Sequence, residues 1–403
     1  MPDEALHTVP ARQVQKDVPI RGSGELVDPM RLTTSEGPAA TLHRKSEVAG
    51  HPRGVVWESG LGHRPFCLTG LQSNAPPARG DECARACLEA GVNEMPGPFD
   101  YSLFGLHIRS DLLLPELLGA CPESEPQVFV QLGRALPAVV TSAGLLSTEA
   151  GVLLTIDGIA RYAIADGCRI IVDRESGVPD ANVRLYLLGS AMGVLLHQRG
   201  MLPLHANAVE IEDGAFAFMG VSGSGKSTLA ASFHDKGYRV IADDVCAVRF
   251  DRSRRPFVTP GLPRLRLWQE ALEGTGRQPS QYSRSYAGDD NWDKFDVPLP
   301  HETAVRAEVE LVGVYLLERG ESLSISQLRG LDATQAVFSN TYRGSYVPAA
   351  GNVQGHWEAC MELVRQTPIF EIRRAWDLGS LAQDVQQIIA HAEALVRSRK
   401  ALS

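Results

Sequence analysis

The sequence is poor in cysteine and has no excess of basic residues. Its seven cysteines stand at positions 67, 83, 87, 121, 168, 246 and 360, an odd number in which Cys83/Cys87 is the one close pair. Without a second close pair or adjacent histidines, this spacing predicts neither a zinc site nor a disulfide framework. We therefore expect reduced thiols, as in a cytoplasmic protein.

The sequence also lacks an excess of positive charge and a long run of apolar residues. A net charge of -9 and a pI near 5.7 argue against a general binder of nucleic acid or of anionic membranes. The start "MPDEALHTVPARQ" has no apolar signal core, and no stretch of about 18 uncharged apolar residues occurs. With 403 residues, 44% hydrophobic and 22% charged, the chain is expected to be globular and cytoplasmic. A homo-oligomer is compatible with this composition.

Regular patterns begin only after the first quarter of the chain. Residues 1–97 are rich in Pro, Gly, Ser and Arg and show no sustained period, so we expect little packed structure there. We hypothesise that translation starts near Met95, and a partner-binding tail is the alternative. Residues 98–180 predict a small, mostly antiparallel β-rich domain. The run "NVRLYLLGSAMGVLLHQRG" then predicts a helix joining it to a second domain, 181–399.

A glycine-rich loop between a predicted strand and a predicted helix carries the most specific motif. "FMGVSGSGKSTLAASF" at 218–233 matches G-x-x-x-x-G-K-[ST]. Such glycines let backbone N–H groups curl around an anion, and the helix N-terminus adds partial positive charge. We therefore expect ATP, with Lys226 at the β/γ phosphates and Ser227 on Mg²⁺. The predicted nucleotide-binding residues are Gly220, Ser222, Gly223, Ser224, Gly225, Lys226, Ser227 and Thr228. A Gly/Ser linker is the alternative.

Two carboxylates, Asp243 and Asp244, end the strand predicted after the loop helix. A right-handed crossover would lay this strand beside the loop strand and bring its carboxyl end to the phosphates. Since successive strand residues face opposite sides, one carboxylate would hold Mg²⁺ while its neighbour points elsewhere. Phosphoryl transfer needs a metal and a carboxylate that accepts the nucleophile's proton. A solvated acidic pair is the alternative.

His205 is expected near the same site. "HANAVEI" and "AFAFMG" flank "EDG", a hairpin signal that puts His205 and Gly220 at one open end of the pair. Beside a carboxylate, an imidazole orients it or shifts its pKa toward that of a base. A histidine held by local hydrogen bonds is the alternative.

The stretch 204–249, "LHANAVEIEDGAFAFMGVSGSGKSTLAASFHDKGYRVIADDVCAVR", resembles the catalytic core of the HPr kinase/phosphorylase family. The resemblance implies an α/β fold, with a P-loop nucleotide domain like that of phosphoenolpyruvate carboxykinase. It implies transfer of phosphate from ATP to a protein serine, with Mg²⁺. Carried over to this sequence, it makes Asp243 the base assisted by His205, has Lys226 bind phosphates, and puts Ser227 and Asp244 on the metal side.

The layout of residues 99–395 is similar to that of HPr-kinase-like proteins of bacterial peptide gene clusters. Some of these, the lasso-peptide tailoring kinases, phosphorylate a serine of a precursor peptide. Thr228 stands where the enzyme that acts on HPr has glutamate, so we expect the metal to be held differently. The implied acceptor is a serine of a peptide or small protein, and reverse phosphorolysis stays open. A kinase for a free amino acid and a nucleotide-binding regulatory protein without transfer are the alternatives.

Basic residues downstream are candidates for contacts with substrate or phosphate. Arg264 and Arg266 would share one face of an extended "PRLRLW", and Lys294 and Arg343 are further candidates. Surface or structural roles are the alternatives. The polar stretch 274–298 predicts a mobile lid or a disordered excursion. Two strands around "RGES" and a helix over "LAQDVQQIIAHAEALVRSRK" are predicted beyond it.

Overall fold

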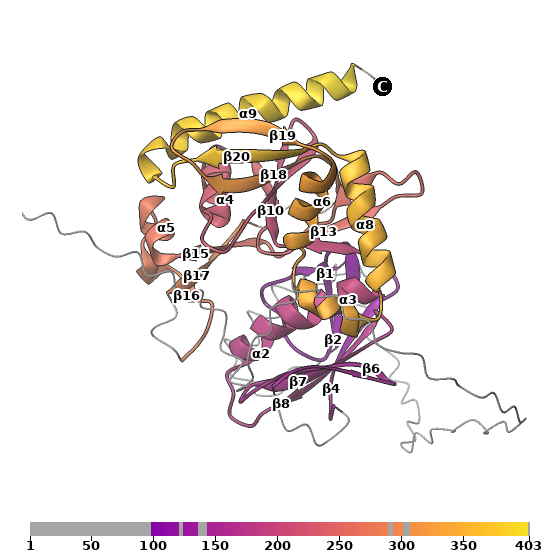
Figure 1. Ribbon diagram of the computed structural model, residues 1–403. Coiled ribbons are helices and arrows are strands. Elements are labelled where there is room, and N and C mark those ends of the chain that lie inside the picture. Colours follow the sequence, from indigo (N-terminus) through magenta and orange to yellow (C-terminus); the bar gives the residue numbers. More distant parts are fainter. Residues whose placement is uncertain (1–97, 121–123, 136–142, 289–292, 301–306, 402–403) are drawn as a thin grey trace, which may run out of the picture. The chain divides into compact units, whose positions relative to one another are not determined.

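The computed structural model describes residues 98–120, 124–135, 143–288, 293–300 and 307–401. The segment 1–97, with the hypothetical start at Met95, lies outside these residues, as do Cys83 and Cys87. The described residues fall in one unit of the chain and form three sheets with flanking helices (Figure 1). Among them, no helix combines the length and apolar character that a membrane span requires.

The first sheet is mostly antiparallel, as predicted. Its strands are β1 (Phe99–Leu103), β2 (Leu106–Ser110), β3 (Leu118–Gly119), β4 (Val128–Leu132), β5 (Gly144–Thr148), β6 (Gly151–Ile156), β7 (Ala160–Ala165) and β8 (Arg169–Arg174). They lie in the order β3-β1-β2-β4-β8-β7-β6-β5, with parallel pairing of β4 to β2 and to β8. Alternating burial along β7 explains why this segment folds as a strand with one covered face.

The predicted connecting helix packs on this sheet. It consists of α2 (Asp180–Tyr186), the π turn η1 (Leu187–Ala191) and α3 (Met192–Gln198), and it ends before Gly200, whose φ is +72°. Val183, Leu187 and Leu195 are buried in one core with Tyr162 of β7. The boundary between the two predicted domains stays a prediction, because this core also includes Ala247, which lies in a strand of the second sheet.

The second sheet carries the phosphate loop. Its strands are β9 (Leu202–Leu204), β10 (Ala206–Ile211), β11 (Gly214–Met219), β12 (Arg239–Ala242), β13 (Cys246–Phe250), β14 (Pro256–Val258), β18 (Val309–Arg319), β19 (Ser324–Leu328) and β20 (Ile369–Arg374). They lie in the order β12-β10-β11-β18-β14-β13-β9, and β20 joins β18 to β19. The hairpin of β10 and β11 is confirmed, and its register places His205 opposite Gly220.

One predicted neighbourhood in this sheet is wrong. The strand after the loop helix, β12, pairs with β10 and not with the loop strand β11. Because β10 is antiparallel to both, β12 and β11 are parallel and still end at one sheet edge. The two strands predicted around "RGES" are confirmed as β18 and β19, and β20 lies between them in the sheet. Long-range pairing decided where β12 and β20 lie, and local patterns do not reveal it.

Helices cover both faces of the second sheet (Figure 1). α4 (Lys226–Asp235) and α9 (Leu378–Lys400) bury apolar side chains against β10, β11 and β18 in one cluster. α6 (Gly330–Ser339) and α8 (Val353–Gln366) do so on the opposite face, while the short α7 (Val347–Ala350) precedes α8. α9 follows the predicted helix, with Asp377 Oδ2 accepting from Ser380 N at 3.1 Å as its N-cap. The predicted α/β fold class is therefore confirmed.

The stretch expected to be a lid or disordered forms ordered structure in its described part. β15 (Arg264–Trp268), β17 (Lys294–Pro298) and β16 (Ser283–Arg284) make a three-stranded sheet, with α5 (Gln269–Gly274) and η2 (Pro279–Gln281) between them. The disordered alternative for 274–298 is wrong there, the mobile lid stays a prediction, and 289–292 lie outside the described residues. Phe295 and Val297 alternate with polar neighbours and are buried against Leu265 and Leu267, a period-2 pattern too short to stand out.

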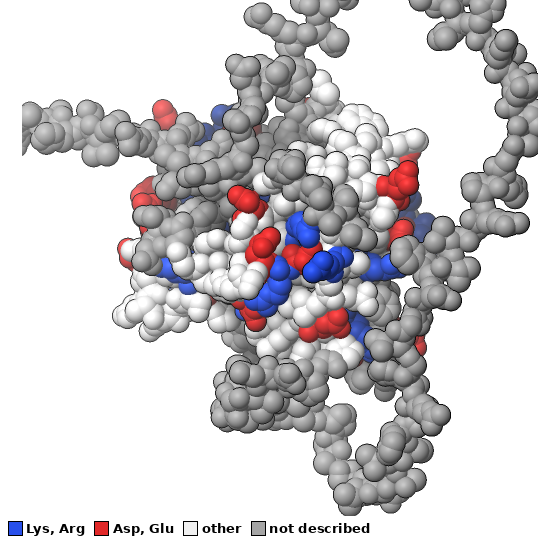
Figure 2. Space-filling model, turned by 90° about the horizontal axis from the view of Figure 1, so that it is seen from below, with Lys and Arg blue, Asp and Glu red and all other residues white. Residues whose placement is uncertain are grey.

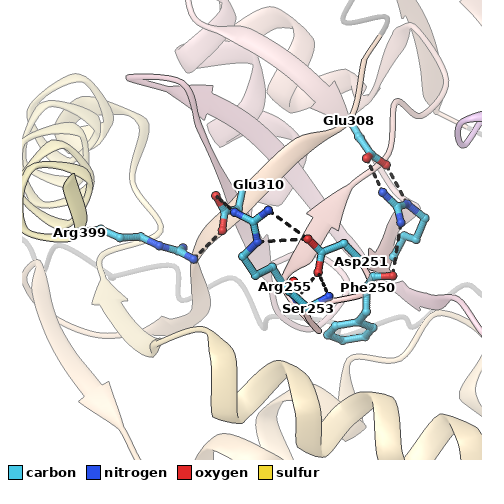
Figure 3. Close-up of polar contacts among 8 residues, drawn as sticks. Phe250, Asp251, Ser253, Arg255, Glu308, Glu310 and Arg399 are labelled. Atoms are coloured by element: carbon cyan, nitrogen blue, oxygen red, sulfur yellow. Dashed lines mark hydrogen bonds and ion pairs between the residues drawn. The ribbon is translucent and has the colours of Figure 1, made fainter. Parts of the chain in front are cut away.

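Ion pairs tie the end of α9 to the second sheet (Figure 3). Arg399 Nη2 donates to Glu310 Oε1 at 2.6 Å, and Arg255 lies 3.1 Å from Asp251 and 3.9 Å from Glu310. These partly exposed pairs contribute at most about 1 kcal/mol each. On the face seen in Figure 2, basic and acidic side chains lie next to each other.

Candidate active site

The phosphate loop joins β11 to α4 as predicted. Gly220 has a φ of +152°, and a Cβ there would lie 2.8 Å from Ser224 Oγ and 2.9 Å from the carbonyl oxygen of Leu317. Gly225 caps α4 with a φ of +83°, in the left-handed region. The sequence thus has glycine where the loop turns most sharply, and the loop leads directly into the helix N-terminus.

Lys226 is folded into this loop. Its Nζ donates to the carbonyl oxygens of Gly220 at 2.7 Å and Val221 at 3.0 Å. Burial lowers the pKa of Lys226 to about 8, although the charges of Asp244 and Asp243 oppose this. The N–H donors of Lys226 Nζ that are expected to bind phosphate oxygens thus donate to backbone carbonyl oxygens instead.

Asn207 is a site residue that sequence reasoning missed. It is fully buried on β10, and its Nδ2 donates to the carbonyl oxygen of Lys226. It stands two residues after His205, and this spacing on a strand, which puts two polar side chains on one face, was the available signal.

Asp243 lies against the start of α4. Ser227 Oγ donates to its Oδ1 at 3.0 Å, and the backbone N of Arg266 donates to its Oδ2 at 2.7 Å. The carboxylate is 5% exposed, and burial raises its pKa, while the hydrogen bond from Arg266 opposes the rise. Asp243 therefore contacts the serine that was expected to bind Mg²⁺.

Asp244, not Asp243, lies beside His205. His205 Nδ1 is 3.2 Å from the carbonyl oxygen of Asp244 and 3.5 Å from its Oδ1. The predicted pairing of His205 with Asp243 is therefore wrong. The reason is backbone geometry: β12 ends at Ala242 and Asp244 has a φ of +72°, so strand alternation no longer applies. Strained left-handed residues of this kind cluster at functional sites.

Basic groups surround Asp244. Burial opposes its ionisation, but Lys294, Arg266 and His205 outweigh burial and hold its pKa well below the usual range. The pKa of His205 is lowered by burial, against the nearby charge of Asp244. Asp244 is therefore ionised and His205 is uncharged at neutral pH.

The predicted arginine pair of β15 lies in the site rather than on the surface. Arg266 Nη1 is 3.2 Å from Asp244 Oδ2, and its Nε donates to Asp296 Oδ1 at 3.2 Å. Arg264 also pairs with Asp296, so both side chains share one face as expected. Asp296 was not predicted. It lies on the same face of β17 as Lys294, two residues away, and its charge balances the two arginines.

The other two basic candidates approach from different sides. Lys294 Nζ lies 5.3 Å from the ring centre of Trp268. Arg343, with a φ of +52° before η3 (Gly344–Tyr346), lies 5.7 Å from the rings of Tyr342 and Tyr346. Its Nε has no hydrogen-bond partner among the described residues.

A cavity of about 780 Å³ brings these groups together. Its walls include the loop start at Gly220 and Ser222, and the predicted residues that line it are His205, Asp244, Arg266, Lys294 and Arg343. Asp243 and Arg264 line a smaller pocket beside it, together with Asp244 and Arg266. Part of the wall also comes from α6, through Asp332, Gln335 and Ala336.

The segment after α6 holds His205 at the cavity, which sequence reasoning did not predict. The backbone N of His205 donates to the carbonyl oxygen of Asn340 at 2.7 Å, and Tyr342 N donates to that of Pro203 at 2.8 Å. The Tyr342 ring packs against Gly189 of the π turn, where an added Cβ would meet its hydroxyl at 3.2 Å. π turns of this kind are frequent at functional sites.

Comparisons with known proteins find one short sequence match and one structural match. No family model matches the chain. The ATP-dependent phosphoenolpyruvate carboxykinase of Shouchella clausii is 46% identical over 56 residues, which span 14% of this chain and only 10% of that protein. The Hpr(Ser) kinase/phosphatase of Coxiella burnetii is 12% identical with a TM-score of 0.24, over 49% of this chain and 96% of that one. The sequence match falls in the family whose nucleotide domain the predicted resemblance names, the phosphoenolpyruvate carboxykinases.

Proposed function

We propose that this protein is an ATP- and Mg²⁺-dependent kinase that transfers the γ-phosphate to a hydroxyl group, that of a serine in a peptide or small protein. One observation carries the proposal. An ionised carboxylate, Asp244, and a neutral imidazole, His205, line the same cavity as the start of the phosphate loop. A protein that only binds nucleotide needs neither group at that place.

The donor side of the proposal rests on the loop and Lys226. Backbone N–H groups of the loop and the N-terminus of α4 attract phosphate oxygens. Lys226 Nζ now donates to two loop carbonyls at 2.7 and 3.0 Å, and a bound triphosphate would take over these donors. Lys226 then neutralises charge on the β/γ phosphates as the bond between them breaks.

The residues beside Lys226 fit a magnesium ion. Ser227 Oγ and Asp243 Oδ1 are 3.0 Å apart, and Mg²⁺ prefers oxygen ligands of this hard type. Ser227 and Asp243 would hold the ion, and we therefore propose Asp243, in place of Asp244, as the carboxylate ligand of Mg²⁺. When bound, Mg²⁺ supplies charge neutralisation for the phosphates. Among the described residues, no group of three or more His, Cys, Asp or Glu is arranged to hold a metal.

The acceptor side rests on Asp244. Its oxygen accepts the proton of the acceptor hydroxyl while the hydroxyl oxygen forms a bond to the γ-phosphorus. The bond from that phosphorus to the β–γ bridging oxygen breaks, and ADP leaves with the electron pair. His205, 3.5 Å from Asp244 Oδ1, orients the carboxylate, and Arg266 at 3.2 Å keeps it ionised until the proton arrives.

The acceptor class rests on the resemblance in layout to lasso-peptide tailoring kinases. The test incubates the protein with γ-labelled ATP, Mg²⁺, peptides encoded beside its gene and free amino acids, and localises the label by mass spectrometry. Label on a peptide serine supports the proposal. Label on a free amino acid would indicate a small-molecule kinase, and bound nucleotide without transfer would indicate a regulatory nucleotide-binding protein. The Lys226→Ala variant, which should transfer no phosphate, is the negative control.

A further inference from the structure

A buried arginine lies behind the phosphate loop, outside the cavity. Arg374 is the last residue of β20, which is parallel to β18, and β18 is parallel to the loop strand β11. Arg374 therefore reaches the sheet edge from which the loop rises. Only 4% of this residue is exposed. Burying a guanidinium so deeply costs free energy unless opposite charge and hydrogen bonds compensate.

Among the described residues, the partners of the Arg374 guanidinium offset the cost of its burial only in part. Asp384 of α9, itself 5% exposed, accepts from Arg374 Nη1 at 3.5 Å, which is long for an ion pair. The same Asp384 oxygen also accepts from Ser380 Oγ at 3.2 Å. Arg374 Nη1 donates to the carbonyl oxygen of Ala375 at 3.2 Å, whereas Nε is shielded from solvent and has no partner among the described residues.

The guanidinium is directed at the loop. Its Nη2 lies 3.0 Å from the point that a Cβ on Gly225 would occupy. Gly225 is the N-cap of α4 and directly precedes Lys226, so it belongs to the backbone that surrounds a phosphate. The positive charge of Arg374, which Asp384 balances only in part, thus lies next to the loop backbone that would bind an anion.

We propose that Arg374 is a positioning residue for the nucleotide. It fixes Gly225, and with it the phosphate loop, in the anion-binding conformation, and a bound β-phosphate completes the balance of its charge. The inference rests on the proposed function, because it requires a nucleotide at the loop. Through Asp384, the same contact links the first turns of α9 to the phosphate site.

Three variants test this role by the affinity for ADP with Mg²⁺, measured by calorimetry. Arg374→Gln alone would leave Asp384 buried and without a partner charge, so it is combined with Asp384→Asn. Asp384→Asn alone keeps the guanidinium and removes its carboxylate. Arg373→Gln is the matched control, because Arg373 is the exposed neighbour on the same strand and pairs with Glu371 at 2.6 Å. Unfolding temperatures without nucleotide confirm that each variant is folded.

The expected changes have opposite signs. The double variant binds ADP about tenfold more weakly, since a positive charge beside the loop is gone. Asp384→Asn alone binds ADP about threefold more tightly, because the phosphate becomes the main counter-charge of Arg374. Arg373→Gln binds as wild type does. If Arg374 and Asp384 served only in packing, the double variant and Asp384→Asn alone would both bind ADP more weakly than wild type.

Two results would overturn the inference. One is equal ADP affinity of the double variant and Arg373→Gln, and the other is weaker binding by Asp384→Asn alone. If the wild-type protein binds ATP and ADP not at all, the proposed function fails as well. If it binds both and transfers phosphate normally while the double variant matches it, only the role of Arg374 fails.

Discussion

The two sides of the cavity are built in different ways. The side proposed to bind ATP, here called the donor side, comes from one continuous segment, which lines the cavity at Gly220 and Ser222 and continues into the first turn of α4. The side proposed to bind the phosphate acceptor, here called the acceptor side, takes His205, Asp244, Arg266, Lys294 and Arg343 from segments far apart in the chain. A continuous segment keeps its geometry through local backbone hydrogen bonds, whereas the acceptor side depends on how sheets and loops pack together.

This difference predicts that changes on the two sides affect different steps of the reaction. Changes on the donor side should remove nucleotide binding and transfer together, while changes on the acceptor side should reduce turnover and leave nucleotide bound. The variants below test this prediction, and each has a partner elsewhere in the chain against which it is compared.

Lys226→Ala should have the largest effect. Without the Nζ that now lies 2.7 Å from the Gly220 carbonyl oxygen, the β/γ phosphates lose their charged anchor, and phosphate transfer should fall by about 10³-fold or more. ATP affinity and labelled-phosphate transfer are measured together. Lys236→Ala, exposed at the other end of α4, is the control and should behave as wild type. Retained ATP affinity in Lys226→Ala would contradict the donor assignment.

Asp244→Asn should affect turnover alone. The amide cannot accept the hydroxyl proton, so kcat should fall by about 10² to 10⁴-fold while ATP still binds. Single-turnover transfer and ATP affinity separate these two steps. Should Asp243→Asn instead lose turnover with normal Mg²⁺ dependence, the family-based assignment of Asp243 as the base would be the correct one.

The place of the glycine-rich loop between β11 and α4 was predictable because its signals are local. Three glycines, one lysine and the flanking strand and helix lie within one stretch, and the observed loop follows them. The hairpin that brings His205 opposite Gly220 was predictable for the same reason, from the turn signal between its strands.

The residues of the acceptor side could be named from the sequence, but the way they lie around the cavity could not be predicted. Which carboxylate faces His205 depends on the left-handed backbone of Asp244, which no spacing rule reveals. Tyr342 and Asp296 were missed because their partners lie across the fold, and single residues at such separations carry no pattern. The position of β12 beyond β10 is likewise a product of long-range pairing.

Asp243→Asn should have an intermediate effect on the donor side. Ser227 would lose the carboxylate 3.0 Å from its hydroxyl, so the Mg²⁺ concentration for half-maximal activity should rise about ten- to a hundredfold. Titration of activity with Mg²⁺ at saturating ATP measures the change. Asp244→Asn, titrated in parallel on its residual activity, should keep the wild-type Mg²⁺ dependence. Identical titration curves for Asp243→Asn and wild type would remove Asp243 from the metal side.

The pH dependence of ATP use should show the smallest effect. The pKa of Lys226 is about 8 because burial lowers it, so its charge is present below that pH and is lost as the pH rises through it. kcat/KM for ATP, which reports the free enzyme, should therefore fall above about pH 8. Bound triphosphate raises the pKa of Lys226, so kcat at saturating ATP should stay level to a higher pH. In Lys226→Arg the guanidinium stays charged, and its kcat/KM should show no such fall. A decline above pH 8 that persists in Lys226→Arg would mean that another group titrates, and the acceptor side would be the place to look for it.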